Sequence, residues 1–431
     1  MGVAIETGEH AYPRDLAALV RKRWGDRPGL PKPATLGRFL STCYQAGLRR
    51  EEERPVTFRL VLAEPGSFPP EAGPPAGLHR LEFVAPRPFD EDELRRLSPA
   101  ADFYRSLIGA RAKGDGGLEI WGLVHSGPRW MRSTQGGRGF APPLPPAPVI
   151  HVRGPGMVEV YRGDEAVADL DGGSLAASSM DVFASRWLRE HFAPVRAELM
   201  ELHREARRRA GEPWAPLDDD LTRVIGQHTV RRVISVLRES HHGGTVVFIP
   251  PELTHEFSGE NRYVAFKHAF AEGETRRRFR TTIVGVMNRL AQIHGKGDAP
   301  SYPRAVGWTE YQQTNDERIA ELDEAIFELA HLIAALASVD GAVVMSKRFE
   351  VLGFGGEISG ALPAAVAVRR ALDLEGERKV RESTDGVGTR HRSVYRLCNA
   401  LPGAVAVVVS QDGNVRFVRR VDGDVTYWDH A

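Results

Sequence analysis

Residues 317–345 read ERIAELDEAIFELAHLIAALASVDGAVVM, and this stretch decides the fold of the second half of the chain. Its apolar residues recur at alternating steps of three and four from Ile319 to Leu336, which predicts one long helix with an apolar face. Asp340-Gly341 then interrupts the pattern, and the apolar run from Ala342 is typical of a buried strand. A long helix followed directly by a buried strand indicates a sheet that is covered by helices.

Strand-like runs continue on both sides of this stretch. Apolar or alternating segments predict further strands at residues 245–250, 349–352, 404–410, 415–418 and 425–428. Helices are expected at residues 181–211, 221–239 and 365–374, the first of them broken at Pro194. We therefore expect an α/β (α+β) protein whose C-terminal part is a mixed β-sheet flanked by helices.

The first part of the chain has shorter segments, separated by Gly and Pro. Two short helices are expected at residues 16–24 and 90–97, among several strands that lie between residues 57 and 170. Proline-rich stretches at residues 65–75 and 142–148 are interpreted as stiff loops, with a polyproline ligand for a partner domain as the alternative. We expect three parts: an N-terminal α+β domain at residues 1–175, a helical connector at 176–236 and the sheet domain at 237–431.

Composition excludes several classes of protein. Lys plus Arg number 57 and Asp plus Glu also number 57, which argues against a generic nucleic-acid binder. Cys43 and Cys398 lie far apart and fit neither a disulfide framework nor a zinc motif. The amino-terminal residues do not resemble a signal peptide, and no apolar run is long enough to cross a membrane. We expect a cytoplasmic protein without a membrane span.

Three short segments carry the residues that suit chemistry on a phosphate: Asp340–Ala342, Gly388–Ser393 and Ser410–Gly413. Arg390, His391 and Arg392 concentrate hydrogen-bond donors that fit phosphate oxygens, and the amides of a helix beginning there would add to them. Each segment also has a plainer interpretation when it is taken alone. Asp-Gly is a turn dipeptide, Arg-His-Arg is often a solvated run of charge, and Ser410–Gly413 suits a hairpin turn.

Taken together, the three segments resemble a known family. VDGAVVM at residues 339–345, GVGTRHRS at 386–393 and VVVSQDGNVRF at 407–417 are similar, in this order, to the motifs of the diadenylate cyclase (DAC) domain. DAC domains join two ATP molecules into cyclic di-AMP. The N-terminal region resembles the probable sensor domains, called DACNV, that precede some bacterial DAC domains.

The resemblance implies roles for individual residues. Asp340, Arg390, His391 and Arg392 would be catalytic, with Asp340 near the ribose 3′-hydroxyl and the metal. The metal would be Mg²⁺ or Mn²⁺, held by Asp340 and Asp412. Further contacts to ATP would come from the following positions: Gly341, Ala342, Glu357, Ile358, Gly388, Thr389, Ser393 and Ser410. The family's chemistry needs two ATP-loaded domains face to face, which implies a homodimer or a higher oligomer.

One difference from the family leaves a second function open. The family has a pair of glutamates after the third motif's Val-Ser, where this chain has Gln411 and Asp412. The loss of one carboxylate favours a non-catalytic sensor that binds ATP or a cyclic dinucleotide in a DAC-like pocket. Asp340 and the intact Arg390-His391-Arg392 favour the enzyme. A P-loop and a hydrolase nucleophile elbow are absent from the sequence, which disfavours those two classes.

Overall fold

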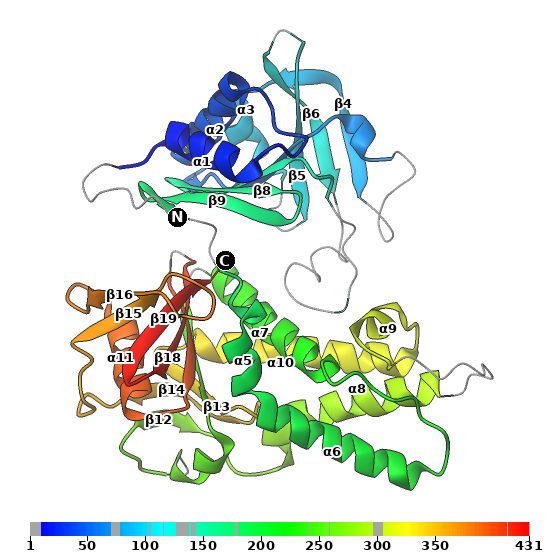
Figure 1. Cartoon of the computed structure of the whole chain (residues 1–431), viewed down its shortest axis with the longest axis vertical. Helices are drawn as coiled ribbons and strands as arrows, with labels where there is room; N and C mark the ends of the chain where they lie inside the picture. Colours follow the sequence, from blue (N-terminus) through cyan, green and yellow to red (C-terminus); the bar gives the residue numbers. More distant parts are fainter. Residues whose placement is uncertain are drawn as a thin grey trace. The chain divides into compact units, whose positions relative to one another are not determined.

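The computed structural model describes residues 10–69, 78–101, 103, 105–114, 116–125, 138, 144–176, 180–240, 242–257, 259–295, 305–411 and 413–430. The chain divides into two compact units (Figure 1), the first formed by residues 1–134 with 139–179 and the second by residues 135–138 with 180–431. Helices and mixed sheets make up both units, which confirms the predicted α/β (α+β) class. In the part of the chain that the structure describes, no helix is long and apolar enough to cross a membrane.

The first unit is built on an eight-stranded sheet within its described residues. The strands, in spatial order, are β10 (Ser174–Ala176), β9 (Glu165–Asp171), β8 (Met157–Arg162), β7 (Pro148–Gly154), β3 (Phe58–Leu62), β5 (Ser106–Ala112), β6 (Leu118–His125) and β4 (His79–Pro88). All neighbours are antiparallel except β3 and β5. The described residues of this unit also form a two-stranded ribbon of β1 (Arg50–Glu51) and β2 (Arg54–Pro55), and a 3₁₀ turn at Pro65–Ser67.

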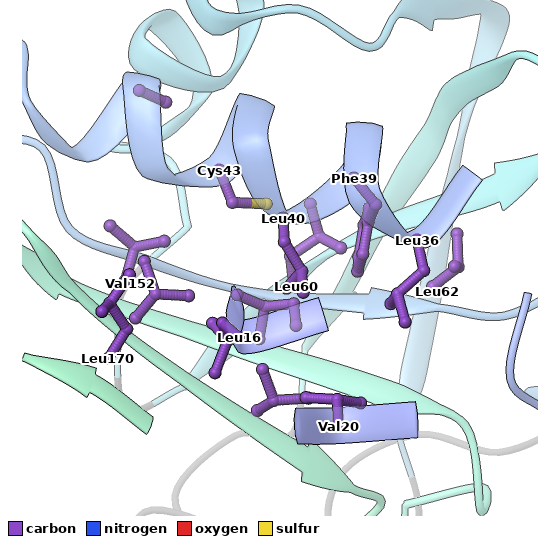
Figure 2. Close-up of a cluster of buried hydrophobic side chains, with 14 of the residues drawn as sticks. Leu16, Val20, Leu36, Phe39, Leu40, Cys43, Leu60, Leu62, Val152 and Leu170 are labelled. Carbon is purple, nitrogen blue, oxygen red and sulfur yellow. The ribbon is translucent and has the colours of Figure 1, made fainter. Parts of the chain in front are cut away.

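Two helices, α1 (Pro13–Trp24) and α2 (Pro33–Gly47), cover one face of this sheet. Figure 2 shows Leu16 and Val20 of α1, Phe39 and Leu40 of α2 and Leu60 of β3, which belong to one buried apolar cluster. A proline at the start of each helix fits the fixed backbone angle that a first turn requires. The third helix, α3 (Glu91–Leu97), is capped by a carboxylate that accepts a hydrogen bond from the Glu93 amide at 2.8 Å.

The second unit contains a nine-stranded mixed sheet among its described residues. The order is β12 (Val264–Ala269), β14 (Val351–Ile358), β13 (Ala342–Ser346), β11 (Gly244–Ile249), β17 (Val405–Val409), β18 (Val415–Val421), β19 (Asp424–His430), β15 (Ala367–Ala371) and β16 (Lys379–Ser383). The pairs β11–β13 and β15–β19 are parallel, and the other neighbours are antiparallel.

Helices cover both faces of this sheet. The helices are α5 (Arg186–His191), α6 (Ala193–Ala210), α7 (Leu221–Ser240), α8 (Arg278–His294), α9 (Trp308–Gln313), α10 (Glu317–Ala337) and α11 (Thr389–Ala400), with 3₁₀ turns at Val182–Ala184, Pro251–Phe257 and Glu274–Arg277. The long helix predicted from residue 317 is α10, and it packs with α7 against one face through Ile333 and Val233. Helix α11 packs against the opposite face through Val394 and Leu397.

Two expectations from the sequence differ from the structure. The helix expected at residues 365–374 is wrong, because strand β15 occupies Ala367–Ala371 and pairs with β16. Val368 and Ala371 are buried there, and the arginines between them pair with acidic residues outside the core. The helices expected to form a connector at residues 176–236 belong, from residue 180 on, to the second unit. Their apolar faces pack on its sheet and on α10, so they are part of its core.

The buried imidazole of His430, at the end of β19, predicts acid sensitivity of the second unit. Its Nδ1 lies 3.2 Å from the amide nitrogen of Val182, and burial lowers the pKa of His430 to about 3, with repulsion from Arg238 and Arg231 adding to the effect. The folded pKa lies below the ordinary value, so the stabilisation is full above about pH 6.5 and is lost as the pH falls toward the folded pKa.

We expect the free energy of unfolding to fall between pH 7 and pH 5, with His430 contributing about 2 kcal/mol of the loss at pH 5. In His430→Asn, whose side-chain oxygen can still accept from the Val182 amide, this part of the pH dependence disappears. Urea unfolding at several pH values measures it. An unchanged slope in the variant would show that His430 is not the group responsible.

Candidate functional site

Four neighbouring strands of the second unit have ends at the same edge of the sheet. β13 begins at Ala342 beside Gly356 near the end of β14, and β11 begins at Gly244 beside Val409 at the end of β17. The parallel register of β11 and β13 pairs Val246 with Val343, so the residues before both strands also lie at this edge. We call it the motif edge, because all three sequence motifs reach it.

Asp340 and Gly341 occupy the middle of the motif edge, in the exposed turn between α10 and β13. Gly341 has a φ of 117°, and a Cβ there would lie 2.5 Å from the carbonyl carbon of Gly355 and 2.7 Å from the amide nitrogen of Gly356. Only glycine fits, since a side chain would meet rigid backbone. This close approach fixes Asp340 beside the end of β14, where Glu357 and Ile358 follow.

The second motif forms the start of helix α11. Gly388 is the N-cap residue and supplies no side-chain cap, and the first turn contains no acidic residue. The helix therefore presents uncapped amide groups and the positive end of its dipole at its amino terminus. Thr389 and Ser393 are four residues apart in a helix, so they share a face.

Arg390 joins the second motif to the third. Its Nη1 lies 3.4 Å from the carbonyl oxygen of His242 and 3.5 Å from that of Val409, the last residue of β17. A Cβ on Gly243 would lie 2.6 Å from the same Nη1 atom. Arg390 is thus packed against the ends of β11 and β17, where it can also donate outward.

The two arginines of the second motif, Arg390 and Arg392, have no carboxylate partner in the described residues. Arg390 is half-buried and Arg392 is exposed, and neither forms an ion pair with any residue that the structure describes. Glu357 instead pairs with Lys267 at 3.2 Å, and Asp385 accepts a hydrogen bond from Ser383 at 2.8 Å. His391 lies between the two arginines, with its ring 6.3 Å from that of Tyr395.

Ser410 begins the turn that connects β17 with β18. Its hydroxyl donates to the Asn414 carbonyl at 3.1 Å, and the Gly413 amide donates to the Ser410 carbonyl at the same distance. The expected hairpin turn is therefore present and holds Ser410 at the motif edge. Asp412, one of the two expected metal ligands, lies outside the described residues. Gln411 is exposed.

Four residues that contribute to the motif edge were not among the predicted site residues. The His242 carbonyl and Gly243 contact Arg390, Lys267 pairs with Glu357, and Arg396 donates to the Gly360 carbonyl at 3.3 Å. Arg396 is one helical turn beyond Arg392, so the helical spacing of the arginines was a usable signal. The Gly243-Gly244 pair before a strongly apolar strand was another. Lys267 had no local signal, since it reaches the edge through the pairing of β12 with β14.

The donor set of the motif edge suits a metal that is bound mainly through a substrate. Within the described ranges no three side chains of His, Cys, Asp or Glu gather at metal-binding distance. Mg²⁺ is commonly held by one or two carboxylates together with substrate phosphates, and Asp340 provides such a carboxylate. Cys398 is buried in α11, where burial raises the pKa of its thiol to about 12, so it is neither a thiolate ligand nor a nucleophile.

Comparison with known proteins identifies a domain in the first unit. Residues 26–125 match the family described as "Probable sensor domain DACNV". The match bears out the predicted resemblance to a probable sensor domain for these residues. The match runs from just after α1 to the last residue of β6, so β7 to β10 extend the DACNV sheet beyond it. No curated protein and no solved structure matches the chain at a significant level.

The glycine at the centre of the motif edge predicts a steric test. In Gly341→Ala the new methyl group would meet the backbone of β14 at under 3 Å in a positive-φ conformation. We expect a loss of about 2–4 kcal/mol in the free energy of unfolding of the second unit, combining backbone strain and overpacking. Gly388→Ala is the control, since a Cβ there meets nothing within 4 Å. Equal stability of the two variants in urea would contradict the close approach of Gly341 to β14.

Proposed function

We propose that the second unit binds ATP at the motif edge and that two such units, face to face, join two ATP molecules into cyclic di-AMP. One observation carries the proposal: the sheet register brings Asp340 and Ser410 to one edge, and the contact of Arg390 with the Val409 carbonyl brings the start of α11 to the same edge. These are the three segments that resemble the DAC motifs. Each motif, taken alone, also has a plainer structural interpretation as a turn or a solvated run of charge. The alternatives do not explain why all three converge.

The cationic helix start is the proposed triphosphate site. The uncapped amides of α11, the guanidinium groups of Arg390 and Arg392, and the Thr389 hydroxyl all donate to oxygen anions. The absence of an ion pair for either arginine in the described residues leaves both able to neutralise a phosphate. His391 and Ser410 would complete the contacts. Adenine would lie at the end of β14, near the backbone of Glu357 and Ile358, on the far side of Asp340.

Asp340 is the proposed catalytic carboxylate. It is exposed, and it lies two strands from Ser410, a separation of about 10 Å at the usual strand spacing. A triphosphate bridging this gap places a ribose near the carboxylate, which can orient the 3′-hydroxyl. Asp340 and the phosphates would hold Mg²⁺ or Mn²⁺, with Asp412 as the second expected ligand. The metal would neutralise negative charge on the phosphates.

The proposed reaction is a pair of identical displacements. In each, the 3′-oxygen of one ATP forms a bond to the α-phosphorus of the other, the bond from that phosphorus to the bridging oxygen breaks, and pyrophosphate leaves with that oxygen. The hydroxyl proton is released to solvent. Two ATP molecules thus give cyclic di-AMP and two pyrophosphates. Positioning and charge stabilisation supply most of the rate in such transfers. The DACNV domain would regulate this step.

A second candidate function rests on Gln411. The amide stands where a family carboxylate is expected, so the same edge would bind ATP or a cyclic dinucleotide without turning it over. Binding alone would then be the signal that the second unit passes on. Both candidates need the phosphate site, and only the enzyme needs Asp340 for turnover.

Mass spectrometry of reactions with ATP and Mg²⁺ or Mn²⁺ separates the two candidates. We expect cyclic di-AMP from the wild-type protein, with specific activity rising with protein concentration because two chains must meet. Asp340→Asn keeps the size of the side chain and removes its charge, so product should fall by at least two decades while ATP still binds. The control is Asp422→Asn, in the exposed turn between β18 and β19, which should retain full activity. Binding of ATP with no product at any protein concentration would establish the sensor instead.

The contribution of Arg390 is tested by a change that keeps the charge. Arg390→Lys loses the planar pair of donors, and a charge-assisted hydrogen bond is worth about 1.5–3 kcal/mol, so ATP affinity should fall by about one to two decades. Calorimetric titration measures the affinity, and the melting temperature without ATP should stay close to that of the wild type. A variant that melts several degrees lower and keeps full ATP affinity would make Arg390 a structural residue, held by the His242 and Val409 carbonyls.

A further inference from the structure

The face of the second sheet opposite to α11 carries an apolar cavity that the nucleotide chemistry does not use. Its volume is about 80 Å³, and it lies between helices α5 to α8 and the strands β11, β17 and β18. Its apolar walls include Phe192, Val195, Ile283, Phe349 and Val405. A smaller cavity of about 10 Å³ adjoins it, sharing the side chains of Val230, Phe248, Phe349 and Val407. Together they form an apolar space in the helical layer of the unit.

The polar residues that border this cavity are strongly biased toward positive charge. Six cationic side chains line it and no carboxylate does; they are Arg189, Arg196, Arg223, Arg280, Lys347 and Arg348. Asp220 pairs with Arg223 at 2.9 Å, and Glu198 is shared by Arg280 at 3.5 Å and Arg348 at 2.6 Å. Arg189, Arg196 and Lys347 form no ion pair with the residues that the structure describes. The cavity therefore has an excess of positive charge.

Lys347 and Arg196 both lie near Phe192. The Lys347 ammonium is 5.9 Å from the centre of the Phe192 ring, and the residue as a whole is 8% exposed. Arg196 is one helical turn from Phe192 and donates to the Arg189 carbonyl at 2.6 Å. Burial lowers the pKa of Lys347 to about 8, with Glu252 opposing and Arg419 adding to the shift. Burying a cation away from water costs free energy unless an anion binds beside it.

Two residues of α7 point to a ligand independently of these charges. Thr222 lines the cavity and is 3% exposed, and its buried hydroxyl has no hydrogen-bond partner among the described residues. Gly226, one turn further, is a glycine in the interior of a helix, where it is unfavourable. No close backbone approach requires it, because a Cβ there would meet only the Phe349 ring at 3.8 Å. Its effect is to keep the cavity open.

We propose that this cavity binds a small carboxylate with an apolar tail of three or four carbons. The tail lies beside Gly226 and Phe349, and the carboxylate meets Lys347, Arg196 and the Thr222 hydroxyl. The size of the tail follows from comparison with an apolar cavity of about 150 Å³ that holds the six carbons of benzene. The cavity of about 80 Å³ has roughly half that volume, so it takes a tail of about half as many carbons, with the carboxylate at its charged border. The ligand would bind between the α5–α7 layer and the sheet whose other end carries the motif edge. This inference does not depend on the nucleotide chemistry.

Binding of pentanoate to the full-length protein tests the proposal, with pentan-1-ol as the uncharged probe of equal length. Saturation-transfer NMR measures both affinities. We expect pentanoate to bind at least tenfold more tightly than pentan-1-ol, and Lys347→Met to abolish that preference.

Gly226→Leu, which fills the cavity, should abolish pentanoate binding without lowering the melting temperature, whereas Gly226→Ala should bind as the wild type does. Three results would overturn the proposal: no pentanoate binding, equal binding of acid and alcohol, or binding that persists in a folded Gly226→Leu protein. If Gly226→Leu does not fold, the preference for the acid over the alcohol in Lys347→Met decides the question by itself.

Discussion

The close packing of the Asp340-Gly341 turn against the end of β14 is the constraint on which the rest of the motif edge depends. Because Gly341 has no side chain, β13 can begin directly beside the backbone of Gly355 and Gly356. The parallel pairing of β13 with β11 then places His242 and Gly243 next to it, and the antiparallel pairing of β11 with β17 adds Ser410. Helix α11 completes the edge through Arg390. One register thus assembles residues that are up to 168 positions apart, from His242 to Ser410.

Much of this arrangement could be predicted from sequence, and the failures have physical reasons. The α10 helix and the β13 strand followed from periodicity alone, since both have strong and uniform patterns. The segment that forms β15 was predicted as a helix because its Ala and Arg residues favour helices, and pairing with β19 and β16 overrode that preference. Helix α2 was not predicted, because Gly, Thr, Ser and Cys give it weak local signals, and burial against the sheet stabilises it instead.

The motif residues themselves could be named from the sequence, but their surroundings could not. That Arg390 contacts two strand-end carbonyls depends on how α11 crosses the sheet, which no local pattern encodes. The cavity near Lys347 was also invisible, since it is formed by side chains from several separate elements. Gly226 lies within the helix predicted at residues 221–239, and the open space beside it becomes visible only in the structure.

Hydrogen–deuterium exchange with saturating α,β-methylene ATP, which cannot release pyrophosphate, tests the central claim about the motif edge most directly. If the motif edge holds the nucleotide, amides at residues 242–244, 340–342, 388–392 and 409–411 should become protected together. Exchange in the helices around the apolar cavity and in the DACNV region should change less. Protection confined to other parts of the chain, with these four segments unchanged under saturating nucleotide, would contradict the account.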